Sequence, residues 1–238
     1  MFGISSKILT MKLGIIGYGK MGKTIEKLSF QYGFQEVVII DNNDEWIQKQ
    51  NDLKSCDVGI EFSTPQTVVF NLEKCFELNI PVVSGTTGWN EQKEDFLKLY
   101  NDKSISFVYG SNFSIGANLF FKLNRYLAQQ MRLQHQYEVS IEERHHIHKI
   151  DAPSGTALTL EKIILSEIET KQNIPIISHR EGEITGEHIV NYNSDEDYIQ
   201  IKHFAHNRTM FAHGALRAAA WLLNHPGIYA FEDIFEKV

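Results

Sequence analysis

The stretch Leu13-Gly14-Ile15-Ile16-Gly17-Tyr18-Gly19-Lys20-Met21-Gly22 decides the fold of this chain. A short apolar run, typical of a buried strand, leads directly into three glycines spaced as G-x-G-x-x-G, and helical periodicity continues through Ile25 and Leu28. A second strand-like run, Val37 to Ile40, ends at Asp41. The order of strand, glycine turn, helix, strand and acid predicts a βαβ unit that binds a dinucleotide.

The three glycines have separate physical roles in such a unit. Gly17 permits the tight turn, Gly19 lets a pyrophosphate approach the backbone, and Gly22 allows the helix to pack closely on the strand. Asp41 is placed to accept hydrogen bonds from the adenosine ribose, and Asn42-Asn43 follows it without an arginine. Because a 2′-phosphate requires a nearby cation, NADH is favoured over NADPH. A glycine turn that binds no ligand is the alternative.

Strand-like and helical segments alternate through the first half of the chain. The strand-like runs lie at 13–16, 37–40, 58–62, 82–84 and 105–109. This alternation predicts an α/β fold with a parallel sheet covered by helices on both faces, here a Rossmann-like domain. Ligands bind at the carboxyl ends of parallel strands, so the loops Phe62 to Pro65 and Gly85 to Gly88 are expected to flank the nicotinamide. Ordinary turns have the same composition, and this alternative stays open.

The pattern changes near Asn112. An amphipathic helix is predicted from Gly116 to Met131, with Leu119, Phe120, Leu123, Tyr126 and Leu127 on one side. An alternating strand at 137–141, a helix from about Gly155 to Thr170, strand-like runs at 188–192 and 198–204 and a last helix at 210–223 follow. We predict a dinucleotide-binding domain made of 11–114 and 215–238, and an inserted α+β domain, 115–214, for the substrate. Residues 1–10 are an extension without an assigned role, since Met11 is an alternative start.

Composition excludes several classes of function. The net charge of −7 argues against nonspecific nucleic-acid binding, which requires clustered excess lysine and arginine. No apolar run approaches the roughly 20 residues that span a bilayer. The two cysteines, Cys56 and Cys75, have neither metal-type spacing nor a disulfide framework, which indicates a reducing, cytoplasmic setting.

The segment His145-His146-Ile147-His148-Lys149 carries the strongest chemical signal. Imidazole suits proton donation because its ordinary pKa, about 6.5, lies near neutral pH. Neighbouring side chains of a strand face opposite ways, so one of His145 and His146 should donate the proton while the other braces the loop or contacts the ligand. Lys149 supplies a cation for a carboxylate. Ser154 is a candidate helix cap, and the N–H groups of Gly155-Thr156 can hold a second carboxylate.

The three histidines are open to two other interpretations. His145, His146 and His148 are possible zinc ligands, but no cysteine or fourth ligand falls at a familiar spacing, so no metal site is predicted. Surface histidines in a polar loop are the second alternative. The downstream runs 180–183 and 203–208 are equally open to two interpretations, as a polar rim or as solvated strand ends.

With these motifs, the chain from Met11 to Val238 resembles the 4-hydroxy-tetrahydrodipicolinate (dihydrodipicolinate) reductases. The His-His-x-x-Lys-x-Asp-Ala-Pro-Ser-Gly-Thr run from His145 to Thr156 is far more specific to that family than the glycine fingerprint. The other matching motifs are Gly17 to Gly22, Ser84 to Trp89, Asn112 to Asn118, Arg180 to His188 and Gly214 to Ala219.

The resemblance implies reduction of a cyclic imine dicarboxylate by NADH or NADPH, in the diaminopimelate route to lysine. It implies His145 as the proton donor and acceptor, Lys149 as the second catalytic residue, and His146, Gly155 and Thr156 as substrate-binding residues. The cofactor-binding residues that it implies are Gly17, Tyr18, Gly19, Lys20, Met21, Gly22, Asp41, Gly85, Thr86, Thr87, Ser111, Asn112 and Phe113. Members of the family are usually homotetramers joined through the sheet of the second domain, and the same is expected here.

The chain also departs from the family pattern. Thr64 stands where many relatives carry arginine, and Asn42 replaces an arginine often found after the second-strand acid, which weighs against NADPH. Two other classes of function remain as alternatives. A nucleotide sensor without enzymatic activity has no need for the proton donor His145. A related dehydrogenase for another substrate is disfavoured by the two-carboxylate arrangement around Lys149 and Thr156.

Overall fold

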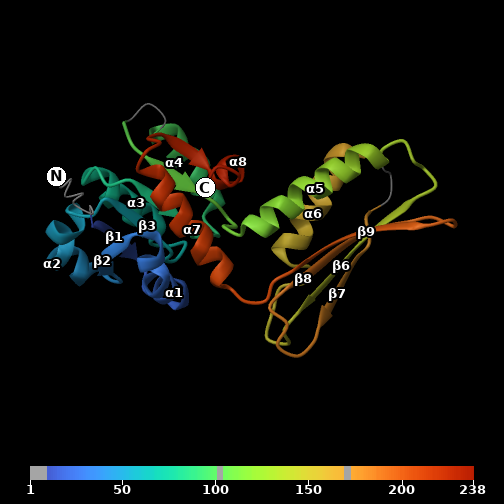
Figure 1. Ribbon diagram of the computed structural model, residues 1–238, viewed down its shortest axis with the longest axis horizontal. Coiled ribbons are helices and arrows are strands. Elements are labelled where there is room, and N and C mark those ends of the chain that lie inside the picture. Colours follow the sequence, from blue (N-terminus) through green and yellow to red (C-terminus); the bar gives the residue numbers. More distant parts are fainter. Residues whose placement is uncertain (1–9, 101–103, 169–172) are drawn as a thin grey trace, which may run out of the picture. The chain divides into compact units, whose positions relative to one another are not determined.

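The computed structural model describes residues 10–100, 104–168 and 173–238, and divides the chain into two compact units (Figure 1). The first unit joins the residues up to Ser114 with Thr209–Val238, and the second is Ile115–Arg208. The second crossing therefore lies at 208/209, where α7 (Thr209–Leu222) begins, rather than at the predicted 214/215. The predicted extension falls almost wholly on residues 1–9, outside the described residues.

The first unit contains a six-stranded parallel sheet in the order β10-β5-β4-β3-β1-β2. Its strands are β1 (Met11–Ile16), β2 (Phe34–Ile40), β3 (Val58–Glu61), β4 (Val82–Ser84), β5 (Phe107–Tyr109) and β10 (Ile228–Ala230). These strands are short and apolar, and β3 and β4 are buried throughout, as expected for strands covered on both faces. The predicted α/β class with a parallel sheet is confirmed.

Helices cover this sheet in two groups. The helices α2 (Asn43–Lys54), α3 (Val68–Glu77) and α4 (Asn90–Tyr100) share one apolar core, to which they contribute Trp46, Leu53, Leu72, Phe76 and Phe96. The helix α1 (Lys20–Ser29), which continues into the short turn η1 (Phe30–Tyr32), packs against α7, and α7 packs on β3, β4 and β5. A final turn, α8 (Phe231–Ile234), follows β10.

The second unit is a four-stranded mixed sheet with two helices. The strand order is β7-β6-β8-β9, with β6 parallel to β7 and antiparallel to β8. The strands are β6 (Glu138–His145), β7 (Ile176–Arg180), β8 (Glu187–Asn193) and β9 (Tyr198–Phe204). The helices α5 (Ile115–Met131) and α6 (Gly155–Glu167) lie along the sheet (Figure 1) and share a core with Ile141, Val190 and Tyr192.

The predicted apolar side of α5 is right for Phe120 and Leu127, which pack in the core of the second unit, and wrong for the other three residues. Leu119, Leu123 and Tyr126 are 47%, 48% and 61% exposed, and the buried line is Phe120, Asn124, Ala128 and Met131. Small and polar residues occupy the buried line because α5 packs closely on α6, where the amide of Asn124 donates to the carbonyl of Leu160 at 3.1 Å. The predicted helix from Gly155 is described as far as Glu167, and its predicted end at Thr170 lies outside the described residues. Within the three described ranges, no helix is long and apolar enough to cross a membrane.

Candidate active site

The glycine loop between β1 and α1 has the geometry of a phosphate-binding turn. Gly17 has φ +91°, and a Cβ there would lie 2.2 Å from the carbonyl oxygen of Phe62. A Cβ at Gly22 would lie 2.3 Å from the carbonyl oxygen of Gly17, so the helix approaches the loop as closely as glycine permits. A Cβ at Gly19 would meet nothing within 4 Å, which leaves the backbone open to a ligand. The following residue, Lys20, is exposed at the helix start.

A pocket of about 290 Å³ lies at the carboxyl ends of β1, β2 and β3. In this sheet β2 lies on one side of β1 and β3 on the other, so the pocket sits where the strand order reverses, the usual ligand position in such folds. The lining residues from the glycine loop and its neighbours are Gly17, Tyr18, Gly19, Asp41 and Asn42, and those from the opposite wall are Trp46, Phe62, Ser63, Thr64, Thr67 and Asn71. No lysine or arginine is found among the described residues that line it.

Asp41 is exposed at the end of β2 and is held by the glycine loop. Its Oδ1 accepts a hydrogen bond of 2.6 Å from the backbone N–H of Tyr18, and its own N–H donates to Glu45 at 2.6 Å. Asn42, the residue that follows this acid, caps α2 by accepting from the N–H of Glu45 at 3.0 Å. The asparagine thus has a local structural role.

A buried carboxylate joins the two loops expected to flank the nicotinamide. Glu61, at the end of β3, is fully buried and accepts hydrogen bonds from the hydroxyls of Ser63, Ser84 and Thr86. Burial raises the pKa of Glu61, and these hydrogen bonds oppose the rise. Asn71 extends the network, because it donates to the hydroxyl of Ser63 at 3.0 Å and accepts from the indole of Trp46 at 3.0 Å. The network therefore runs from the wall of the pocket to the Gly85–Thr87 loop.

The other residues implied for the cofactor site differ in exposure. Thr86 is buried, and its hydroxyl donates a hydrogen bond to Glu61, while Thr87 and Ser111 are exposed. Asn112 accepts from the N–H of Ser114 at 2.9 Å. The ring of Phe113 is buried between Phe62 and Phe231, so Phe113 supports its loop from the core. Gly85 is required beside it, because a Cβ there would meet the ring of Phe62 at 2.1 Å.

In the second unit, strand alternation places a carboxylate beside the predicted proton donor. Ile141, Glu143 and His145 occupy alternate positions of β6 and are all buried. The strand register sets His188 of β8 opposite Glu143 and Arg180 of β7 opposite His145. His145 is the last residue of β6, and α6 begins nearby, since the N–H of its cap Ser154 donates to Glu143 at 3.1 Å.

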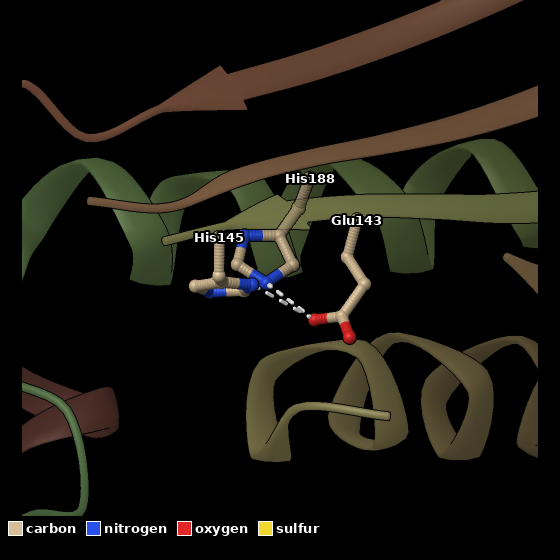
Figure 2. Close-up of side chains that lie close together, drawn as sticks. All are labelled: Glu143, His145 and His188. Atoms are coloured by element: carbon tan, nitrogen blue, oxygen red, sulfur yellow. Dashed lines mark ion pairs between the residues drawn. The ribbon is translucent and has the colours of Figure 1, made fainter. Parts of the chain in front are cut away.

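Glu143 is the centre of this cluster (Figure 2). Its Oε2 lies 3.2 Å from Nδ1 of His145 and 3.8 Å from Nε2 of His188, while its Oε1 accepts from the guanidinium of Arg180 at 3.0 Å. The hydroxyl of Ser154 lies 3.1 Å from Nε2 of His188. Sequence analysis missed Glu143 and His188, although the alternation Ile141, Glu143, His145 was the signal that places Glu143 on the buried face.

Charge is distributed unevenly over the cluster. Burial alone raises the pKa of Glu143, but hydrogen bonds from Ser154, Ser178 and Arg180 outweigh it and bring the pKa to about 2. Burial lowers the pKa of His188 to about 4, helped by the charge of His145. Burial also lowers the pKa of His145, and the carboxylate of Glu143 opposes that shift. At neutral pH the cluster therefore has an ionised Glu143 and a neutral His188.

The remaining predicted substrate residues surround the end of β6. Lys149 donates to both carboxylate oxygens of Asp151, at 2.7 and 2.8 Å, and its carbonyl accepts from Arg180. His146 is half-buried, and its backbone N–H donates a hydrogen bond of 2.7 Å to the carbonyl of Ile184. Ser154 caps α6 as predicted, by accepting from the N–H of Ala157 at 3.3 Å. Helix geometry then leaves the N–H groups of Gly155-Thr156 without partners inside the helix.

Among the described residues, the three histidines of the zinc alternative do not form one ligand group, although the rings of His146 and His148 lie 6.0 Å apart. His148 is 70% exposed and lies 3.5 Å from Glu183. Glu143, His145 and His188 are instead close, with their side-chain nitrogen and oxygen atoms within 4.8 Å of one another. We interpret them as a hydrogen-bonding and ion-pair cluster, because the guanidinium of Arg180 and the amide of Ser154 already bind Glu143. Chemically, the arrangement combines a buried imidazole, an anion that stabilises its protonated form, a nearby ammonium group and a helix N-terminus.

Both units match one family over nearly their whole length. Residues 11–113 match the family described as "Dihydrodipicolinate reductase, N-terminus", and residues 116–235 match "Dihydrodipicolinate reductase, C-terminus". The chain belongs to the dihydrodipicolinate reductase family. The resemblance inferred from the sequence motifs is thereby confirmed.

Individual relatives of this reductase family agree. A curated protein of Christiangramia forsetii, described as 4-hydroxy-tetrahydrodipicolinate reductase, is 40% identical, with 96% of this chain and 99% of the relative covered. One of Thermosipho africanus with the same description is 35% identical, with 95% and 99% covered. The structure of a dipicolinate-bound dihydrodipicolinate reductase from Paenisporosarcina sp. TG-14 has a TM-score of 0.74 and 23% identity, with 95% of this chain and 100% of that chain covered. At that identity the structural likeness supports the fold.

Proposed function

We propose that this protein reduces 4-hydroxy-tetrahydrodipicolinate to tetrahydrodipicolinate, in the synthesis of lysine through diaminopimelate. Family membership supports the reaction, because the curated relatives with 34 to 40% identity are described by that activity. The observation that carries the proposal is the end of β6, where His145 lies beside an ionised Glu143 and the N-terminus of α6. A sensor of nucleotides has no use for such a proton donor.

In this proposal the residues of the second unit bind and protonate the substrate. Lys149 binds one carboxylate of the cyclic imine, and the N–H groups of Gly155 and Thr156 bind the other, with His146 contacting the ligand from its edge. His145 supplies the proton once hydride has reached the ring. Because only the imidazolium can donate, activity requires the protonated form of His145 and falls as the pH rises above its pKa.

The cofactor is the hydride donor, and the first unit fits it. Gly17 to Gly22 would hold the pyrophosphate, since Gly19 is open to a ligand and the helix dipole of α1 favours an anion. Asp41 would bind the adenosine ribose, and the Gly85–Thr87 and Ser111–Phe113 segments would flank the nicotinamide. We propose NADH as the preferred cofactor, because Asp41 is an acid and none of the described pocket-lining residues is cationic.

We further propose that the protein is a cytoplasmic homotetramer assembled through the sheet of the second unit. The helices α5 and α6 share a core with one face of that sheet. Its strands also carry exposed apolar side chains, with Ile177 48%, Tyr198 68% and Ile199 38% exposed. The buried free thiols of Cys56 and Cys75 suit a reducing compartment. Sedimentation of the purified protein tests the assembly, and a monomer would contradict it.

The proposed reaction is tested by following the oxidation of NADH and, separately, NADPH by purified protein. The upstream synthase generates the unstable substrate in place from pyruvate and aspartate semialdehyde. Loss of reduced-nicotinamide absorbance that depends on the synthase is expected, and it should be faster with NADH. Pyridine-2,6-dicarboxylate, a planar mimic of the substrate, should inhibit it. Folded protein that binds NADH yet shows no synthase-dependent oxidation would contradict the proposal.

A further inference from the structure

We propose that Glu143 is a positioning residue that holds the Nδ1–H of His145, so that Nε2 is the nitrogen that gives its proton to the substrate. The inference rests on the proposed function and goes beyond it, because it assigns the tautomer and the orientation of the proton donor. Glu143 acts through His145 and has no contact of its own with the reacting atoms.

The two nitrogens of His145 have different surroundings. Nδ1 is buried and lies 3.2 Å from Oε2 of Glu143 as an ion-pair contact, and in the described ranges neither of these two atoms has a hydrogen-bond partner that would compete for the other. Nε2 faces Gly186, where a Cβ would come within 3.2 Å of it, so glycine at 186 leaves space beside that nitrogen. Figure 2 shows Glu143 and the ring of His188 on the Nδ1 side of His145. The proton on Nδ1 therefore faces Glu143 within the protein, and the proton on Nε2 is available to a bound ligand.

Glu143 is itself fixed in both position and charge. Its Oε1 binds the amide of Ser154 and the guanidinium of Arg180, which leaves Oε2 for His145. Arg180 also donates to the carbonyls of Lys149 and Asp151. The same guanidinium thus ties the carboxylate behind His145 to the loop that carries the substrate-binding ammonium of Lys149.

Proton balance follows from this arrangement. In the imidazolium, Nδ1–H points to Glu143 and Nε2–H points away from it. When the proton passes to the substrate carbanion, the Nε2–H bond breaks, its electron pair stays on the ring and a C–H bond forms. The ring is left as the neutral Nδ1–H tautomer that Glu143 prefers, and solvent restores the proton to Nε2. The anion of Glu143 stabilises the charged form before transfer and the correct tautomer after it.

The titratable and charged groups around His145 are known from each neighbouring element. Glu143 lies on the same strand, His188 and then His203 on β8 and β9, Arg180 on β7, and Lys149 with Asp151 in the loop. The first turn of α6 carries no acid. Glu143 is the nearest anion, so removing its charge should move the titration of His145 more than any other single neutralisation.

The first test needs no variant. Nitrogen-detected NMR of the wild-type protein without ligands, above the pKa of His145, should show the Nδ1–H tautomer at this ring. A ring in the Nε2–H tautomer would overturn the inference. Because this measurement does not use the substrate, it stands apart from the proposed reaction: absence of activity with the expected tautomer would contradict the reaction alone.

The second test is Glu143→Gln, which keeps the size of the side chain and removes its charge. A positioned acid contributes about 10²–10⁴-fold to the rate, so a kcat loss of up to that size is expected with unchanged binding of NADH. The alkaline limb of kcat/KM should also move to lower pH, which a merely structural role would not produce. Glu143→Asp keeps the charge and should restore the limb toward its wild-type position.

Glu142→Gln is the matched control. Glu142 is the residue of β6 that precedes Glu143, and its side chain lies on the opposite face of the sheet, where it pairs with Arg144 at 3.2 Å. Its neutralisation should leave both the limb and the tautomer of His145 in place. An unchanged limb in Glu143→Gln, or an equal shift in Glu142→Gln, would overturn the inference. If Glu143→Gln does not fold, the wild-type tautomer still decides the question.

Discussion

The backbone N–H of Tyr18 donates a hydrogen bond of 2.6 Å to Oδ1 of Asp41, which ties the glycine loop after β1 to the end of β2. The acid expected to bind the adenosine ribose is therefore also part of the scaffold of the phosphate loop. The pocket between them includes Gly17, Gly19 and Asp41 in its lining.

Asp41→Ala is expected to weaken the binding of NADH by about tenfold or more, because hydrogen bonds to a charged group contribute about 1.5–3 kcal/mol to the binding free energy. NADPH should lose less, since its 2′-phosphate is repelled by the same carboxylate. Fluorescence titration with both nucleotides measures the two losses. Asp44→Ala, one helical turn away in the exposed start of α2, is the control. Equal losses for both nucleotides would remove Asp41 from the ribose site.

His145→Gln should lower turnover by about 10²–10⁴-fold with little change in NADH binding, the usual contribution of a positioned acid. His148→Gln serves as the control, because His148 is 70% exposed and only 3 residues away in sequence. Steady-state oxidation of NADH in the coupled assay gives both values. Turnover near that of the wild type in His145→Gln would exclude this residue as the proton donor.

The stability of the fold should depend on pH through His188. Its folded-state pKa of about 4 lies below its ordinary 6.5. As the pH falls from 6.5 toward 4, the unfolded chain therefore binds a proton that the folded chain does not. The free energy of unfolding should fall by about 3 kcal/mol as the pH falls through that window. Above pH 6.5 the full contribution of the neutral His188 to stability is present. Urea unfolding at several pH values measures the slope. His188→Gln should flatten it, whereas the exposed His148→Gln should not.

Gly214→Ala tests the packing behind the cofactor site. A Cβ at Gly214 of α7 would lie 1.8 Å from the carbonyl oxygen of Phe113, so the helix or the loop must move. Overpacking of this kind costs about 1–3 kcal/mol, and a lower melting temperature with weaker NADH binding is expected. Gly155→Ala at the start of α6 is the control, because a Cβ at Gly155 would meet nothing within 4 Å. This variant should have a melting temperature close to that of the wild type. Similar melting temperatures for both variants would show that α7 adapts.

Much of the fold follows from patterns that are local in sequence. The runs around Ile15, Ile39, Ile60 and Val83 are apolar and short, and their spacing suffices for a parallel sheet. Three elements lacked that signal. Helix α2 buries only Trp46 and Leu53 in a polar sequence, and β10 has three residues. Strand β7 ends in a polar run, in which Ser178 and Arg180 bind Glu143 of the neighbouring strand β6.

The candidate site was predictable where the residues are adjacent in sequence, as in the His145 to Thr156 run. Glu143 was not predicted, because an acid in a Glu-Glu-Arg run is ordinarily solvated, and its burial depends on partners 11 to 45 residues away, Ser154, Arg180 and His188. Which charged residue a sheet buries depends on pairing between strands, and that information is absent from local periodicity.

The pairing of Lys149 with Asp151 has a consequence for the selection of ligands. The ammonium already has a carboxylate at 2.7 Å, so an incoming carboxylate replaces one anion by another at Lys149 and returns the exposed Asp151 carboxylate to solvent. A neutral ester or amide of the same ring interacts more weakly with the Lys149 ammonium than the carboxylate of Asp151 does, so it should not displace Asp151 or bind. Selectivity for acids over their uncharged derivatives would thus arise from competition within the chain itself.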